Sequence, residues 1–252
     1  MRVLVLGGTS QASELAVLLA GRRDIQAMLS FAGRTVAPVA PPISFRIGGF
    51  GGPDGLAAYL KAERIDILVD ATHPFADRIS RNASIAAGKT NIPLITLSRP
   101  AWTREAGDDW IEASDMESAV AALGCEPKRV FLTVGRLQLQ AFEAAPQHFY
   151  LIRSIDPSAA PLNLPHHRMI AARGPFAVEA EEHLLRAEKI DVIVAKNSGA
   201  AAVFGKILAA RRLGVPVIMI ERPPIGAQAV HDPTDVITFI LRHGAISALR
   251  GV

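Results

Sequence analysis

The chain opens with "RVLVLGGTSQASELAVLLAG", in which a short apolar run ends in two glycines before a helical pattern begins. Gly7 and Gly8 permit a tight turn, and Thr9 or Ser10 can cap the helix that follows. The amides of a helix's first turn and the positive end of its dipole favour a phosphate. Ala12 stands where a dinucleotide fingerprint carries its third glycine, a position that needs only a small residue. We therefore expect Gly7, Gly8 and Thr9 to bind a phosphate; a turn without a ligand is the alternative.

The region after the second apolar run is where a dinucleotide fold meets the adenosine ribose, and an acidic residue there selects NAD. This chain has no Asp or Glu between Ile25 and Pro53, and it offers Ser30, Arg34 and Thr35 instead. A guanidinium and hydroxyl groups suit a 2′-phosphate, so the pattern favours NADP. An ordinary surface arginine is the alternative reading of Arg34.

Two further loops have the composition of a ligand site. "GGFGGPDG" concentrates glycines around one aromatic ring, and such a backbone can lie flat against a ring or a phosphate, or serve as a hinge. In "DATHPFA", Thr72 and His73 follow a buried run, and His73 can donate a hydrogen bond or act as an acid. The residues of these loops that we expect near the cofactor are Gly49, Phe50, Gly51, Gly52, Thr72, His73 and Phe75.

The second half of the chain carries cations after its apolar runs. "AKNSG" places Lys196 and Ser198 at the end of one run, where several donors suit an anion, although a capped helix start explains them as well. Arginines also follow strands or occupy connecting loops, and together they point to a ligand with several carboxylates. The residues that we expect to bind it are Arg99, Arg136, Arg153, Arg173, Lys196 and Ser198.

These loops need parallel strands to position them, and the chain alternates strand-like runs with helical patterns. Beyond residues 2–6, the expected strands are 25–31, 67–69, 94–97, 130–134, 150–155, 169–171, 192–195 and 217–220. "ERIDILVDATHPFA" is similar to "EKIDVIVAKNSGA", and "RVLVLGG" to "RVFLTVG", which indicates an internal repeat. We expect an α/β fold of two similar Rossmann-like halves, residues 1–115 and 116–252, with mainly parallel sheets and a cleft between them.

Composition limits the classes of function. Hydrophobic residues make up 50% and charged residues 20% of the 252 residues, as in compact globular proteins. The net charge of +3 comes without basic runs, which argues against nucleic acid. One cysteine, no signal peptide and no long apolar run predict a cytoplasmic protein away from membranes, and no histidine spacing predicts a metal site.

The set "GGT", "SFAGRT", "GGFGG", "DATHPFA", "RP.W", "RGPF" and "KNSG" resembles the precorrin-6A reductases of cobalamin biosynthesis, in the family's order and from Arg2 to about Pro224. The resemblance implies a reductase that transfers hydride from NADPH to a double bond of a ring-contracted tetrapyrrole, giving its dihydro product. The many acetate and propionate groups of that substrate fit the cationic loops. Residues 1–115 would then bind NADP and residues 116–252 would contribute the tetrapyrrole site.

The identity of the proton donor stays open, with His73 and Lys196 as the candidate catalytic residues. Hydride transfer itself requires mainly that the protein orient the cofactor and exclude water. One alternative is a reductase of the cobalt-loaded intermediate. Another, of a different class, is a non-catalytic regulator that binds NADP. We expect a monomer or a small homo-oligomer.

Overall fold

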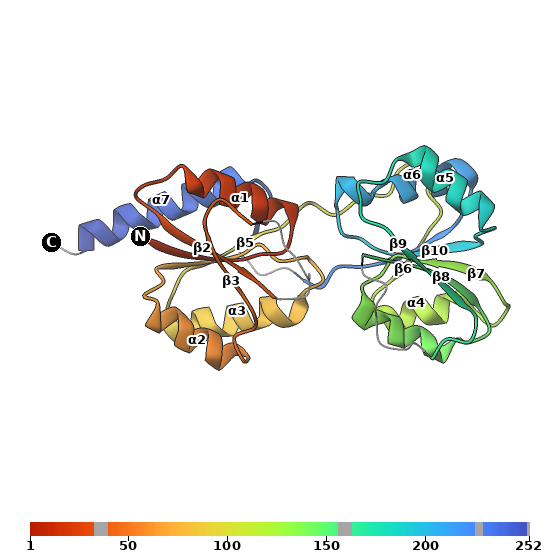
Figure 1. The fold of residues 1–252 in the computed structure, drawn as a ribbon, viewed down its shortest axis with the longest axis horizontal. Helices are drawn as coiled ribbons and strands as arrows, with labels where there is room; N and C mark the ends of the chain where they lie inside the picture. The colour runs from red at the N-terminus through yellow and green to blue at the C-terminus, as the bar shows by residue number, and fades with distance from the viewer. Residues whose placement is uncertain (33–39, 156–162, 225–228, 251–252) are drawn as a thin grey trace. The chain divides into compact units, whose positions relative to one another are not determined.

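The structure is a computed structural model that describes residues 1–32, 40–155, 163–224 and 229–250. The chain forms two compact units: the first unit comprises residues 1–100 and 223–252, and the second unit comprises residues 101–222. Each unit is built on a six-stranded sheet in which every strand pair is parallel. Figure 1 shows both units as α/β layers, with helices on both faces of each sheet. The expected fold class is therefore confirmed.

The sheet of the first unit has the strand order β12-β5-β4-β1-β2-β3. Its strands are β1 (Arg2–Leu6), β2 (Gln26–Phe31), β3 (Ser44–Ile47), β4 (Ile67–Asp70), β5 (Leu94–Leu97) and β12 (Ala229–Val230). Helices α1 (Ser10–Ala20) and α7 (Pro233–Arg250) lie on one face, and α2 (Pro53–Ala62) and α3 (Asp77–Thr90) on the other (Figure 1).

Strand β1 is buried on both faces, which explains its uninterrupted apolar sequence. Val3 and Val5 pack into the cluster that contains α1 and α7, whereas Leu4 and Leu6 pack into the cluster that contains α2 and α3. Because neighbouring side chains of a strand point to opposite faces, this one strand anchors both helical layers. The turn that follows it is therefore held on a rigid support.

The second unit repeats this architecture with the strand order β6-β11-β10-β7-β8-β9. Its strands are β6 (Trp110–Ala113), β7 (Arg129–Leu132), β8 (Phe149–Ser154), β9 (His167–Ala171), β10 (Val192–Lys196) and β11 (Val217–Ile220). Helices α5 (Val178–Ala187) and α6 (Gly205–Leu213) cover one face (Figure 1). The 3-10 helix η1 (Arg136–Ala144) and α4 (Met116–Leu123) cover the other, and a short 3-10 turn, η2 (Ala201–Val203), precedes α6.

The two repeats exchange their last strand and helix. After β5 the chain enters the second unit, where β6 pairs with β11 and leads into α4. After β11 it returns to the first unit, where β12 pairs with β5 and leads into α7. The compact units therefore divide after Pro100 and Arg222, whereas the sequence placed a single boundary after residue 115. The repeat signal follows the chain, and the exchanged strands are too short to reveal which sheet they join.

Every strand expected from the sequence is present, with ends displaced by at most two residues. The strands β3, β6 and β12 were not expected. All three lie at sheet edges, where few positions are buried and the apolar pattern is weak. The missed β3 matters most, because it adds a strand end to the edge where ligands bind in parallel sheets.

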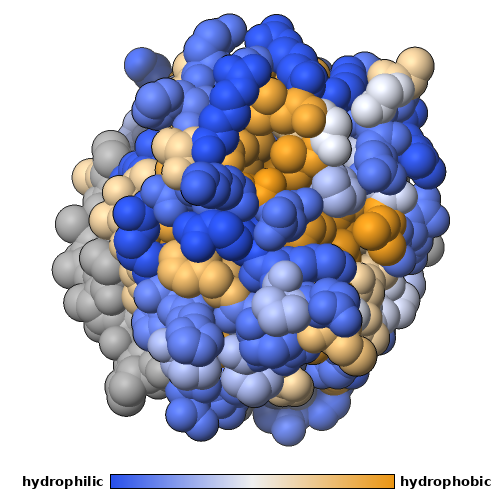
Figure 2. All heavy atoms as spheres, turned by 90° about the vertical axis from the view of Figure 1, so that its right-hand side faces the viewer, coloured by the Kyte–Doolittle hydropathy of each residue, from blue (hydrophilic) through white to orange (hydrophobic). Residues whose placement is uncertain are grey.

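No helix among the described residues is long and apolar enough to cross a bilayer. The face of the molecule in Figure 2 is mostly hydrophilic, with apolar side chains gathered in one hollowed area. Within the described ranges, no group of three His, Cys, Asp or Glu side chains is arranged to hold a metal ion.

Candidate cofactor and substrate site

The turn after β1 has the geometry of a phosphate-binding turn. A Cβ on Gly7 would lie 2.6 Å from Cδ1 of the buried Leu29, so any larger residue there would force that side chain of β2 to shift. Gly8 has a φ of +121° and open space on its Cβ side. Thr9 caps α1: its Oγ1 accepts a hydrogen bond from Ala12 N (3.1 Å) and donates one to the carbonyl of Ala71 (2.8 Å). The capping bond fixes the helix start, whose dipole favours an anion.

A cation lies beside this turn. Nη1 of Arg99, which follows β5, donates to Oγ of Ser10 at 3.2 Å. Partial burial lowers the pKa of the Arg99 guanidinium, although an arginine remains charged at neutral pH. Arg99 was expected to bind substrate, which stays a prediction; its contact with Ser10 places it beside the predicted phosphate turn. Gln11, the next residue of α1, is buried and donates to the carbonyl of His231 (2.7 Å), so its amide ties α1 to the segment between β12 and α7.

The ends of β2 and β3 form a second cluster at the same edge of the sheet. The amide of Gly7 donates to the carbonyl of Ser30 (2.9 Å), which joins the turn after β1 to the end of β2. Arg46 of β3 is the register partner of Ser30, and its Nη1 donates to Oγ of Ser30 at 2.9 Å. Arg34 and Thr35, the other expected contacts of a 2′-phosphate, lie outside the described residues. Sequence reasoning missed Arg46, because β3 was not recognised and the arginine was not seen to end a strand.

The loop "GGFGG" is docked firmly onto α2. Gly48, Gly51 and Gly52 have φ values of +126°, +78° and +95°, in the region that side chains disfavour. Phe50 packs edge-on against Tyr59 of α2, with ring centroids 5.1 Å apart. A Cβ on Gly55 would lie 1.7 Å from the carbonyl oxygen of Phe50, so the loop contacts the helix backbone directly. Gly49, Gly51 and Gly52 have open space on their Cβ sides, which leaves that backbone accessible to a ligand.

The loop "DATHPFA" at the end of β4 is held by a buried carboxylate. Oδ1 of Asp70 accepts hydrogen bonds from the amide (3.1 Å) and the hydroxyl (2.6 Å) of Thr72. Nδ1 of His73 accepts from the amide of Phe75 at 3.2 Å, and the two rings lie 5.9 Å apart. Because Nδ1 accepts, the proton of the neutral imidazole is on Nε2. His73 can therefore present an N–H donor while its other nitrogen holds the loop.

In the second unit, the equivalent strand ends carry cations. Lys196 ends β10, and a Cβ on Gly135 would lie 3.4 Å from its Nζ and 2.5 Å from Oε1 of Gln138. The ammonium of Lys196 therefore extends over the turn that follows β7. Ser198 is buried, and its Oγ accepts from the amide of Ala200 at 3.5 Å. Arg173 is exposed after β9, and the side chain of Arg136 lies outside the described part of the structure.

Arg153, which was expected to bind a ligand with several carboxylates, is largely buried in β8. Its side chain is 8% exposed, and Nη2 pairs with Oε1 of Glu181 at 2.6 Å. Its Cζ lies 3.9 Å from the ring centroid of Phe176 and 4.7 Å from that of Phe131. Nε of Arg153 and Oε2 of Glu181 are buried without a hydrogen-bond partner among the described residues. A buried pair of opposite charges binds an added anion less strongly than an unpaired cation would.

A buried lysine next to this pair was not anticipated. Nζ of Lys206, on α6, donates to the carbonyl of Val203 at 2.8 Å and lies 5.4 Å from the ring centroid of Trp102. Burial lowers its pKa from 10.5 to about 7; Glu181 opposes this shift and Arg153 adds to it. No sequence signal identified it, because lysines on helices are usually exposed.

The motifs "RP.W" and "KNSG" meet at Asn197. Its Oδ1 accepts from the amide of Trp102 (2.7 Å), and its Nδ2 donates to the carbonyl of Trp102 (2.9 Å). Its own carbonyl accepts from Nε of Arg222 at 2.6 Å. Asn197 thus fixes both segments through which the chain enters and leaves the second unit, and we assign it a structural role.

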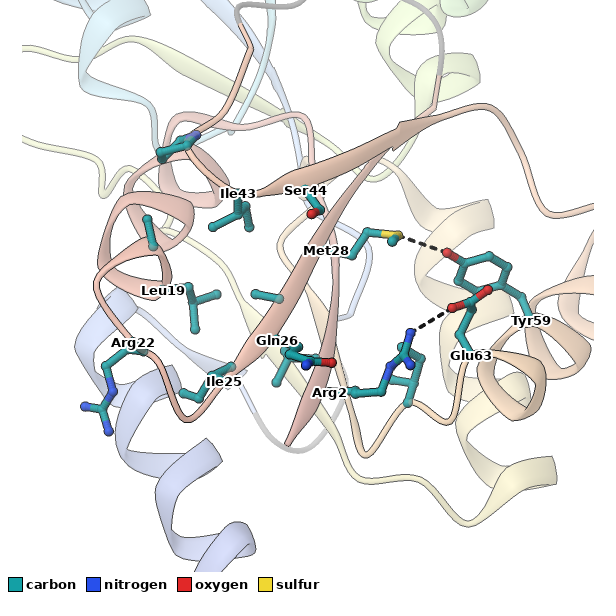
Figure 3. A pocket seen from close by; sticks show the side chains of 15 residues that line it. Arg2, Leu19, Arg22, Ile25, Gln26, Met28, Ile43, Ser44, Tyr59 and Glu63 are labelled. Carbon is teal, nitrogen blue, oxygen red and sulfur yellow. Dashed lines mark hydrogen bonds and ion pairs between the residues drawn. The ribbon is translucent and has the colours of Figure 1, made fainter.

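A hollow of about 440 Å³ lies elsewhere in the first unit, at the amino ends of its strands (Figure 3). Arg2, Gln26 and Ser44, which line it, are at or near the starts of β1, β2 and β3. The Arg2–Glu63 ion pair (2.8 Å) and the Tyr59–Met28 contact (3.0 Å) close one side. Ligands of parallel sheets bind beyond the carboxyl ends, so this hollow is not the expected site.

Taken together, the hydrogen bonds join the ends of β1, β2, β3 and β4 into one edge that presents glycine backbone, hydroxyls and cations. This edge contains Gly7, Gly8, Thr9, Ser30, Gly49–Gly52, Thr72, His73 and Phe75. Lys196, Ser198 and Arg173 occupy the corresponding edge of the second unit. That the two edges share one cleft stays a prediction.

Comparison with known proteins identifies the family. The family model described as "Precorrin-6x reductase CbiJ/CobK" matches residues 2–241. A precorrin-6A reductase of a Sinorhizobium species is 55% identical over 88% of this chain and 85% of its own length. The precorrin-6A reductase of Rhodobacter capsulatus is 49% identical over 100% of this chain and 99% of its own. A solved structure, "CobK precorrin-6A reductase", is 48% identical, covers 97% of both chains and has a TM-score of 0.90. The chain belongs to the precorrin-6x reductase CbiJ/CobK family.

Proposed function

We propose that this protein is a precorrin-6A reductase of cobalamin biosynthesis that uses NADPH. Membership of the family over nearly the whole chain carries the proposal. The relatives reported above are named for precorrin-6A and not for a cobalt complex, so the metal-free tetrapyrrole is the favoured substrate. The cobalt-loaded intermediate is the alternative.

The carboxyl edge of the first unit fits a dinucleotide. Gly8 leaves open space beside the start of α1, and Arg99 supplies a positive charge there for a diphosphate. The loop Gly49–Gly52 offers accessible backbone. The end of β2 presents Ser30 with the guanidinium of Arg46 beside it, and the sequence has no Asp or Glu between residues 25 and 53. This combination fits NADPH better than NADH.

NADPH, when bound, supplies the hydride that reduces a double bond of the macrocycle. The protein's residues hold the reactants in place and exclude water. In the tautomer in which Nδ1 accepts from Phe75, the Nε2–H group of His73 is the candidate hydrogen-bond donor at this strand edge. Lys196, Ser198 and Arg173 provide positive charge and donors for carboxylates of the tetrapyrrole, with Arg136 as a further candidate.

The experiment is to mix the purified protein with precorrin-6A or its cobalt complex, each with either NADPH or NADH, and to follow the loss of reduced nicotinamide absorbance. We expect turnover with NADPH and much slower turnover with NADH. NADPH binding without turnover of either tetrapyrrole would favour the non-catalytic regulator, and turnover of only the cobalt complex would favour the alternative substrate.

The division of roles between the units is tested on Lys196→Ala, with one titration for each ligand. We expect a larger loss of affinity for the tetrapyrrole than for NADPH, because a carboxylate would lose its charge partner and keep its desolvation cost. A collapse of NADPH affinity with unchanged tetrapyrrole binding would mean that the second unit serves the cofactor.

A further inference from the structure

Arg46 of β3 provides a cationic side chain where β2 and β3 pair, beside Ser30. Its Nη1 donates to Oγ of Ser30 and to the carbonyl of Gly48, both at 2.9 Å, and its Nη2 donates to the carbonyl of Gly49 at 3.3 Å. Its Cζ lies 4.1 Å above the ring centroid of Phe50. The guanidinium is therefore fixed in position on a strand end, a glycine loop and an aromatic face.

These contacts orient the charge of Arg46 without neutralising it. All three acceptors are uncharged, and no ion pair among the described residues includes Arg46. A guanidinium has five N–H donors, so two remain for another acceptor. The matching strand pair of the second unit, β8 and β9, carries Arg153, and there Glu181 supplies a carboxylate at 2.6 Å.

The place of Arg46 in the fold determines which anion it meets. In a dinucleotide fold the end of the second strand faces the adenosine ribose, and the residue there distinguishes a 2′-hydroxyl from a 2′-phosphate. In this chain the end of β2 presents Ser30, and Arg46 covers it from β3. A fixed guanidinium beside a hydroxyl is a favourable arrangement for a phosphate monoester.

We propose that Arg46 is the residue that selects NADPH over NADH, by binding the 2′-phosphate with its remaining donors. The proposal rests on the proposed function, since it assumes that the first unit binds the nicotinamide cofactor. It moves the main contribution from Arg34, expected from the sequence, to a residue on β3.

The test measures binding of adenosine 2′-monophosphate and adenosine 5′-monophosphate by calorimetry, with wild type, Arg46→Met and Arg46→Lys. In Arg46→Met we expect the affinity for the 2′-phosphate to fall about 10–100-fold and the affinity for the 5′-phosphate to stay nearly unchanged. Arg46→Lys keeps the charge and should recover part of the loss. Arg22→Met, which removes an arginine paired with Asp24 in the same unit, is the matched control and should bind both ligands normally.

If both Arg46→Met and Arg46→Lys lost affinity for adenosine 2′-monophosphate and adenosine 5′-monophosphate equally, Arg46 would only shape the loop, and the proposal would be overturned. So would an unchanged 2′-phosphate affinity in Arg46→Met, or a loss seen in Arg34→Met alone. Failure of the proposed function has a different signature, because the wild type would then show no preference for NADPH over NADH. If wild type and Arg46→Met both preferred NADPH to the same extent, only the role of Arg46 would be rejected, and the proposed function would stand.

Discussion

Lys206 gives the protein a pH dependence of stability that a single substitution should remove. Its ammonium is buried, donates one hydrogen bond to the carbonyl of Val203, and makes no ion pair with a carboxylate among the described residues. Burial lowers its pKa from 10.5 to about 7. In the unfolded chain the lysine regains its ordinary pKa, so between these two values the unfolded state binds a proton that the folded state lacks. The free energy of unfolding therefore rises with pH through this window and is lowest when Lys206 is protonated.

The magnitude follows from the size of the shift. Each pKa unit corresponds to about 1.4 kcal/mol, so the shift amounts to about 5 kcal/mol in full. From about pH 6 to about pH 9, the contribution of Lys206 to the free energy of unfolding should increase by about 2–3 kcal/mol. Two buried charges act on its pKa in opposite directions: Glu181 raises it and Arg153 lowers it.

The assay is urea unfolding of wild type and Lys206→Met across this pH range. The difference in free energy of unfolding, wild type minus variant, should become more positive by about 2–3 kcal/mol as the pH rises. Lys89→Met removes an exposed lysine and should leave the pH dependence unchanged. If wild type and Lys206→Met showed parallel pH profiles, Lys206 would not change its protonation on unfolding, and the argument from burial would be refuted.

Three further predictions concern the loops. Asn197→Ala should lower the free energy of unfolding by about 1–3 kcal/mol, measured by urea unfolding, because two hydrogen bonds to the backbone of Trp102 are lost; an unchanged value would contradict the structural role. Gly55→Ala should lower the affinity for NADPH in a fluorescence titration, because the added Cβ would displace the carbonyl of Phe50 and with it the glycine loop. An unchanged affinity would show that the loop does not contact the cofactor. Arg99→Met should lower the affinity for NADPH about 10-fold or more in the same titration, because the positive charge at the phosphate turn is lost. A loss of affinity for the tetrapyrrole alone would instead mean that Arg99 binds the substrate.

Much of the fold could be predicted because buried parallel strands have continuous apolar sequences. The run at Arg2–Leu6 and the run at Val217–Ile220 were located to the residue, since both are buried on two faces. Edge strands lack that signal: β3 is mostly exposed, and β12 is two residues long. The sheet that each edge strand joins depends on tertiary packing, which local sequence does not encode.

The candidate site could be predicted only where glycines or a motif mark a loop. The turn at Gly7 and the loop "DATHPFA" were recognised in this way. Arg46 and Lys206 were not, because their significance depends on what lies around them: for Arg46, a register partner on β2, and for Lys206, burial against Trp102. Arg153 was expected to bind carboxylates of the substrate, and only the structure reveals its pairing with Glu181.

The exchange of β12 and α7 between the repeats has a consequence for biosynthesis on the ribosome. The second unit is one continuous stretch and can complete its sheet as soon as residue 222 has been made. The first unit begins earlier but finishes last, because Val236 and Ile240 of α7 belong to the same core cluster as Val3 and Val5. Until α7 emerges, the nascent chain carries apolar surface of the first unit that this helix must cover. A premature stop near residue 223 would therefore damage the amino-terminal core while leaving the second unit's sheet intact.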